Sequence, residues 1–123
     1  MPLLAEYILD AALSTLDTET NRLDICSAEP TTYTEATSTL TLGNKTALNV
    51  GAPTARTPNG RKVVIAAITD GTVTGTATAT HYGVVDTVNT RLHATAAISP
   101  TQAVTSGNVF TTGATDIGIP AAA

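Results

Sequence analysis

The sequence predicts a mainly β protein, an antiparallel β-sandwich of jelly-roll-like type with a short amphipathic helix at its N-terminus. Turn residues separate short apolar or alternating segments at intervals of roughly 8–12 residues, which is typical of a sandwich. Threonine, whose branched Cβ favours extended backbone, is the most abundant residue, with 26 copies. No helical crossover pattern lies between these segments, which argues against a parallel α/β sheet.

Residues 2–16 are predicted to form the helix. Pro2 suits the first helical position, where the missing N–H costs nothing. A helix this short is unstable alone, so its apolar stripe is expected to be buried against the protein's own sheet or against a neighbouring subunit. The chain thus divides into a helical arm, residues 1–20, and a β-sandwich domain, residues 21–123. Apolar residues recurring at helical spacing form the predicted stripe: Leu3, Leu4, Tyr7, Ile8, Ala11, Ala12 and Leu16.

The most detailed strand prediction concerns residues 59–85. Residues 61–68 are nearly all apolar, and the pairs Asn59-Gly60 and Asp70-Gly71 on either side are typical of tight turns. This pattern predicts a central strand with a turn at each end. Residues 72–85 then alternate strictly, with threonine on one face and mostly small residues on the other.

The composition favours a protein that works in contact with other subunits. Charged residues make up 13% of the chain, and it contains one Phe, three Tyr and no Trp. Since such a core is modest, we expect oligomerisation or docking to supply part of the stability. Residues 1–36 hold seven acidic residues and one basic residue, whereas residues 37–123 hold five basic and three acidic residues. This asymmetry predicts either head-to-tail docking or simply a solvated acidic face.

No catalytic constellation is complete, so we expect a protein that is not an enzyme and that holds no cofactor and no metal ion. His81 and His93 are predicted to lie on one hairpin with Asp86 nearby, but a zinc site needs three or four ligands. An ordinary cross-strand pair or no contact at all is therefore expected. Cys26 is near Asp24 and lacks the positive neighbours that lower the pKa of a thiol. The sequence has no phosphate-binding glycine loop and no nucleophile elbow.

Neither nucleic acid nor a membrane is an expected partner. The net charge is −4 and aromatic residues are scarce, whereas nucleic-acid interfaces are basic and use aromatic stacking. No segment approaches the ~20 apolar residues of a membrane span. A protein partner is expected instead. The candidate contact residues are Leu4, Tyr7 and Ile8 on the helix and the basic residues Arg56, Arg61 and Lys62 around one turn.

Several turn and strand segments resemble those of a known group of proteins. They are residues 23–30 (LDICSAEP), 41–46 (TLGNKT), 57–63 (TPNGRKV), 79–86 (ATHYGVVD), and 102–110 (QAVTSGNVF) continuing to 116–120 (DIGIP). Together they resemble small virion structural proteins of tailed bacteriophages, in the group that includes capsid cement or decoration proteins. Relatives often have a larger aromatic residue where this chain has Tyr82.

The resemblance implies a non-enzymatic protein that binds the outer surface of a phage capsid and stabilises it. Its implied partners are the major capsid protein and further copies of itself, as a homodimer or homotrimer. Its implied location is the virion, after synthesis in the cytoplasm of the bacterial host. One alternative is a tail, neck or fibre component. Another is a carbohydrate-binding β-sandwich. It is disfavoured because sugar stacking needs exposed aromatic rings, and the chain has only four aromatic residues in all.

Overall fold

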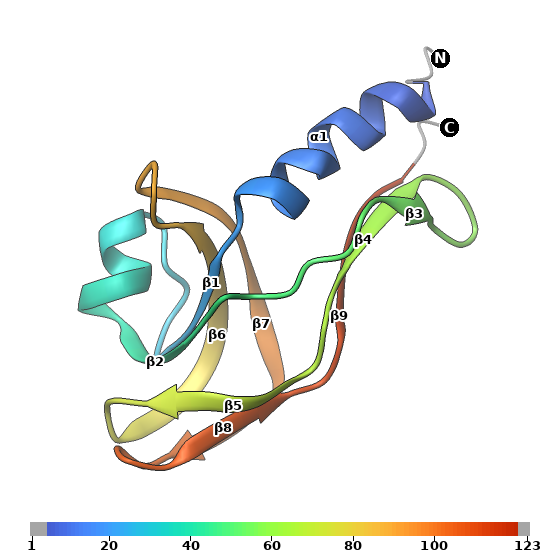
Figure 1. The fold of residues 1–123 in the computed structure, drawn as a ribbon. Helices are drawn as coiled ribbons and strands as arrows, with labels where there is room; N and C mark the ends of the chain where they lie inside the picture. Colours follow the sequence, from blue (N-terminus) through green and yellow to red (C-terminus); the bar gives the residue numbers. More distant parts are fainter. Residues whose placement is uncertain (1–4, 121–123) are drawn as a thin grey trace.

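The computed structural model describes residues 5–120 (Figure 1). An N-terminal helix is followed by antiparallel sheets, which confirms the mainly β fold and is consistent with a β-sandwich. The elements in chain order are α1 (Glu6–Glu19), β1 (Arg22–Cys26), the π-helical turn η1 (Glu35–Thr39), β2 (Thr41–Thr46), β3 (Thr54–Ala55), β4 (Arg61–Ile65), β5 (Ile68–Val73), β6 (Ala77–Asp86), β7 (Arg91–Val104), β8 (Val109–Thr112) and β9 (Thr115–Ile119).

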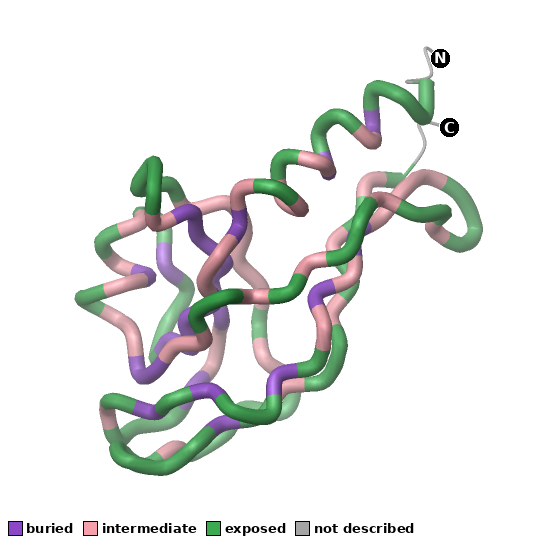
Figure 2. The backbone as a smooth tube through the Cα atoms, viewed as in Figure 1, coloured by how far each residue is buried: buried purple, intermediate pink, exposed green. Residues whose placement is uncertain are grey.

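Six strands form one antiparallel sheet in the order β7-β6-β1-β2-β5-β8. The sheet curls into a half-barrel, and its first and last strands, β7 and β8, do not pair within residues 5–120 (Figure 1). Buried segments gather around β1 and β6, as Figure 2 shows. The buried apolar residues of this core are Leu23, Ile25, Leu42, Ile65, Ile68, Val73, Ala79, Tyr82, Val84 and Phe110.

A long two-stranded ribbon connects the half-barrel to the second sheet. Strand β5 pairs with β8 in the half-barrel, while β4 pairs with β9 in a three-stranded sheet of order β3-β4-β9. The prediction of one central strand over residues 61–68 is therefore wrong. The backbone leaves the ladder after Ile65, because the N–H of Ala66 donates to the carbonyl of Asn49, and the chain resumes pairing at Ile68.

The two predicted glycine turns have different outcomes. Gly60 has a φ of 92° and accepts a hydrogen bond from the N–H of Arg56, so the turn between β3 and β4 is confirmed. Gly71 lies inside β5, opposite Phe110, so the predicted turn at Asp70-Gly71 is wrong. A Cβ at Gly71 would lie 2.3 Å from the Phe110 ring, so this glycine makes room for an aromatic side chain.

The predicted unbroken alternation over residues 72–85 is also wrong. Strand β5 ends at Val73, and β6 begins at Ala77 after a turn. Within β6 the pairing with β7 shifts between Ala79 and His81. At this shift Thr80 of β6 lies opposite residues 98–101 of β7, so the surplus residues belong to β7. The core receives Ala79 before the shift and Tyr82 after it.

Candidate functional site

The helix and the three-stranded sheet together form an arm, defined as α1, β3, β4 and β9. Figure 1 shows α1 extending away from the half-barrel alongside β4 and β9. In Figure 2 the outer end of this arm is mostly exposed, whereas its base near the half-barrel contains buried residues. The arm and the turn between β3 and β4 carry all the described residues that the sequence predicted to contact a partner.

The helix turns a different face toward the protein than the sequence predicted. Leu9 and Leu13 are buried, with 3% and 2% of their surface exposed, and they hold α1 against β4. Tyr7 is 80% exposed and Ile8 is 48% exposed. The predicted burial of Tyr7 and Ile8 against the chain's own sheet is therefore wrong. Leu4, the third nominated helix residue, lies outside the described residues.

An ion pair lies on the same face of the helix as Leu9 and Leu13 and fits this rotation. Asp10 accepts hydrogen bonds from Nε and Nη2 of Arg61 on β4, at 2.7 and 3.2 Å. Glu6, one turn earlier, lies 4.0 Å from Arg61 Nη1. The hydrogen bond from Arg61 to Asp10 raises the pKa of this arginine. Turning Asp10 toward β4 brings Leu9 and Leu13 to the sheet and leaves Tyr7 and Ile8 on the solvent side.

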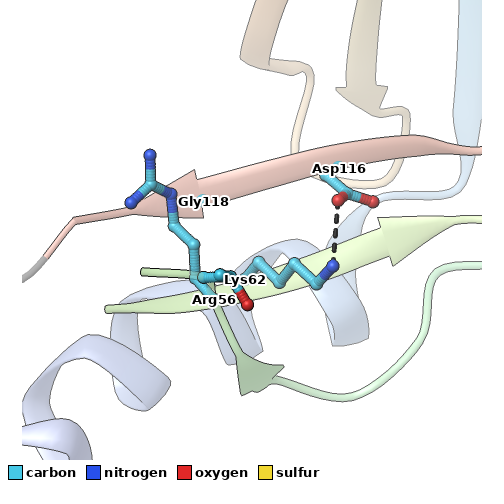
Figure 3. Close-up of a pocket in the computed structure, with 5 residues that line it drawn as sticks. Arg56, Lys62, Asp116 and Gly118 are labelled. Atoms are coloured by element: carbon cyan, nitrogen blue, oxygen red, sulfur yellow. Dashed lines mark hydrogen bonds and ion pairs between the residues drawn. The ribbon is translucent and has the colours of Figure 1, made fainter. Parts of the chain in front are cut away.

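The opposite face of the three-stranded sheet is polar. Successive residues of a strand point to opposite faces, so Lys62 points away from the helix that Arg61 contacts. Lys62 Nζ lies 2.9 Å from Asp116 Oδ2, the ion pair drawn in Figure 3. Arg56 extends across Gly118, where a Cβ would lie only 2.9 Å from its Cδ. These residues and Thr57 line a shallow open hollow.

The structure therefore divides the five described candidate contact residues between separate surfaces. Tyr7 and Ile8 form an exposed apolar helix surface. Arg56 and Lys62 share the polar hollow, which sequence reasoning did not foresee because Asp116 and Gly118 are distant in the chain. Arg61 lies on the other face of the sheet and is engaged with Asp10, so the three basic residues do not form one patch.

His81, His93 and Cys26 lie apart from one another, whereas Asp86 lies near His93. His81 pairs in register with Ala97 rather than with His93, and its Nε2 lies 3.7 Å from Glu29. His93 contacts Thr20 at the end of the helix. The Cys26 side chain is fully buried, and this burial raises the pKa of its thiol to about 12. A thiol with this pKa stays protonated at neutral pH and is a poor nucleophile.

No family model, curated protein or solved structure matches this chain. Among residues 5–120, no helix has the length and apolar character that crossing a membrane would require.

Proposed function

We propose that this chain is a non-enzymatic virion structural protein that binds the outer surface of a phage capsid and stabilises it. The arm is its contact region, and the major capsid protein is the partner that covers Tyr7 and Ile8. The resemblance of the turn and strand segments supports this role, and so does the exposed apolar surface of the arm. The observation that carries it is the exposure of Tyr7 and Ile8 on a helix that is already anchored through its other face.

The anchoring of the helix supports this role. Leu9, Leu13 and the Asp10–Arg61 ion pair hold α1 in place before any partner binds. A partner that covers Tyr7 and Ile8 therefore does not have to order the helix, and such preorganisation lowers the entropic cost of binding. Tyrosine is also frequent at interfaces, because its ring buries a large area while its hydroxyl keeps a polar contact.

The polar hollow supplies a second set of groups for the same partner. Arg56 presents a guanidinium whose Nη1 donates to the carbonyl of Asn59 at 3.0 Å, which fixes the side chain over Gly118. A fixed guanidinium suits a carboxylate of the capsid surface, because its planar fork matches two carboxylate oxygens. Homo-oligomer formation on the shell remains part of the proposal.

Binding to capsids tests the role of the helix. Purified protein is mixed with phage particles that lack it, and co-sedimentation measures the affinity. The double variant Tyr7→Ser, Ile8→Ser is expected to bind at least about 10-fold more weakly, since burying one large apolar side chain contributes about 1.5–3 kcal/mol. Val88→Ser is the matched control, because Val88 is also 80% exposed but lies on the β6–β7 loop, near the opposite end of α1 from Tyr7 and Ile8. Equal binding by the double variant and the control contradicts the assignment of α1 as the contact.

Mass spectrometry of intact particles tests the location. A copy number that matches the capsid lattice supports the capsid assignment. A handful of copies per particle contradicts it and favours a tail or neck component. Absence of the protein from purified particles contradicts the virion role altogether.

A further inference from the structure

Three side chains able to bind a metal ion meet where the arm joins the half-barrel. Glu19 is the last residue of α1, Asp86 is the last residue of β6, and His93 lies near the start of β7. One ligand atom from each of them lies within 4.8 Å of the other two. Glu19 Oε1 lies 3.8 Å from His93 Nε2. In Figure 1 the end of α1 meets the upper ends of β1 and β7 at this point.

A β-bulge directs His93 into the cluster. Val84 pairs with Ala94 and Val85 pairs with Leu92, so His93 is the extra residue of β7. Bulges redirect side chains and are frequent next to functional sites. The His93 side chain is only 10% exposed, and its Nδ1 lies 2.8 Å from Thr20 Oγ1. This hydrogen bond orients the ring, as the outer-shell partners of metal-binding histidines do.

Asp86 is held in position by the loop that follows it. Its Oδ1 accepts hydrogen bonds from the N–H groups of Val88 and Asn89, and its Oδ2 accepts one from Asn89 Nδ2 at 2.7 Å. The three hydrogen bonds therefore preorganise the carboxylate as a ligand. Only 1% of the Asp86 surface is exposed.

Glu19 forms an ion pair with Arg91, but its Oε1 lacks a hydrogen-bond partner within the described residues. Glu19 Oε1 is buried and accepts no hydrogen bond. The cationic Arg91 Nη1 and the His93 Nε2 each lie 3.8 Å from it, which is too far for a hydrogen bond. When His93 donates its Nδ1 proton to Thr20, the lone pair on Nε2 faces the Glu19 carboxylate. Two carboxylates and a nitrogen lone pair then converge on one point, an arrangement that a cation stabilises.

We propose that Glu19, Asp86 and His93 form a binding site for a divalent transition-metal ion of the Zn²⁺ type. One imidazole nitrogen and two carboxylates are ligands that Zn²⁺ accepts, with water in the fourth position. Bonds of about 2.0–2.2 Å place tetrahedral ligands roughly 3.4 Å apart, so the side chains have to close by about an ångström. Ca²⁺ and Mg²⁺ are less suited, because they prefer oxygen ligands alone.

The three ligands come from the helix and from both strands of the β6–β7 hairpin. A bound ion therefore ties the end of α1 to the half-barrel and fixes the direction of the arm. This consequence for the arm rests on the proposed function, whereas binding of the ion itself does not.

Calorimetric titration of the full chain with Zn²⁺ tests the site. We expect one Zn²⁺ per chain and a rise in Tm of at least about 3 °C at saturating metal. Glu19→Gln and His93→Gln are expected to weaken binding at least about 10-fold, since each removes one of three ligands. His81→Gln is the matched control, because His81 also faces a glutamate, Glu29 at 3.7 Å, but belongs to no such cluster. Unchanged affinity in both cluster variants, or a loss in the His81 variant instead, overturns the proposal.

A second measurement uses the unmodified chain and is independent of variant folding. Mn²⁺ broadens the NMR signals of amides near its binding site. Broadening confined to residues 19–21, 86–89 and 91–94 supports the proposal, whereas broadening centred elsewhere or spread evenly over the acidic residues overturns it. Capsid binding measured with and without Zn²⁺ then tests the role of the ion in the arm. A protein that binds Zn²⁺ but no capsid retains the metal site and refutes only the proposed function.

Discussion

At the scale of single residues, Asp24 is the buried charged group that depends most on its hydrogen-bond partners. It lies in the middle of β1 with no exposed surface, yet it is a carboxylate. Nε and Nη2 of Arg22 donate to its two oxygens at 2.6 and 2.8 Å, and Thr41 Oγ1 donates to Oδ2 at 2.6 Å. The hydrogen bond to Asp24 raises the pKa of Arg22. Each oxygen of the buried carboxylate is therefore matched by a donor.

Replacing Asp24 by asparagine is expected to destabilise the protein by about 2–4 kcal/mol, because it leaves Arg22 without its counter-charge in a largely buried place. Asp70→Asn is the matched control. Asp70 pairs with Lys45 at 3.0 Å, but its side chain is 68% exposed, so the cost is expected to stay below about 1 kcal/mol. Urea unfolding measures both values. Similar losses in the two variants contradict the special role of the buried pair.

The Cys26 thiol predicts a loss of stability at high pH. Burial raises its pKa from 9.0 to about 12, and the nearby Asp24 carboxylate adds to the rise. Above pH 9 the unfolded chain releases the thiol proton while the folded chain keeps it, so the free energy of unfolding falls as the pH rises. We expect a decrease of about 1 kcal/mol between about pH 8 and about pH 10, measured by urea unfolding.

Cys26→Ala separates this effect from others. The variant is less stable at every pH because it loses a buried side chain, but its stability depends less on pH over this interval. Burial also raises the pKa of Tyr82, so some loss remains in the variant at the highest pH values. An identical pH dependence in both proteins contradicts the assignment to Cys26.

At the scale of elements, α1 has two apolar surfaces: Leu9 and Leu13 pack against β4, whereas Tyr7 and Ile8 are exposed. Leu13→Ala is expected to destabilise the protein by about 2–4 kcal/mol, because Leu13 is only 2% exposed and its truncation leaves a cavity against β4. Tyr7→Ala, at a position 80% exposed, is expected to change stability by less than about 0.5 kcal/mol. Thermal unfolding of both variants checks the difference. A large loss in Tyr7→Ala indicates that this face is covered in solution.

The close pairing of β5 with β8 depends on the absence of a side chain at Gly71. Gly71→Ala is expected to cost about 1–3 kcal/mol, because the new Cβ would lie 2.3 Å from the buried Phe110 ring, which has little room to move. Gly113→Ala is the control, since nothing lies within 4 Å of its Cβ position. Urea unfolding compares the two. Equal stability shows that the ring can shift at no cost.

Features that depend on neighbouring residues were predictable from the sequence, whereas features that depend on contacts between distant residues were not. The turn at Asn59-Gly60 follows from neighbouring residues, and so does the existence of a helix near the N-terminus. The rotation of that helix does not, because Tyr7 and Ile8 fit helical spacing as well as Leu9 and Leu13 do. The partner that settles it, Arg61, is far along the chain from Asp10.

The metal-binding cluster and the polar hollow also depend on contacts between distant residues, so the sequence did not predict them. Glu19 joins His93 only because a β-bulge redirects the imidazole, and nothing in the local sequence marks the bulged residue. The polar hollow depends on Asp116 and Gly118 of β9, which meet Arg56 and Lys62 through strand pairing across the chain. Basic residues grouped in sequence were separated by the alternation of the strand, which places Arg61 and Lys62 on opposite faces.

At the scale of the whole molecule, the two parts differ in how firmly they are held. Strand β1 lies between β2 and β6, with the core on one face and η1 on the other. Helix α1 is anchored mainly by two buried leucines and the Asp10–Arg61 pair. A helix of 14 residues is marginal without such packing. Local opening of the arm is therefore expected to require less free energy than opening of the half-barrel.

Native-state hydrogen exchange tests this difference in the full-length protein. Amides of α1 are expected to exchange at least about 100-fold faster than those of β1, which corresponds to a difference of about 2.7 kcal/mol in opening free energy. Strand β4 is expected to resemble α1 more than β1, because α1 covers it and its sheet has only three strands. Equal protection of α1 and β1 contradicts this view and shows that the ribbon through both sheets makes the molecule unfold as one unit. If the proposed metal site is correct, adding Zn²⁺ slows exchange in the last turn of α1 selectively, because the ion then has to dissociate before that turn opens.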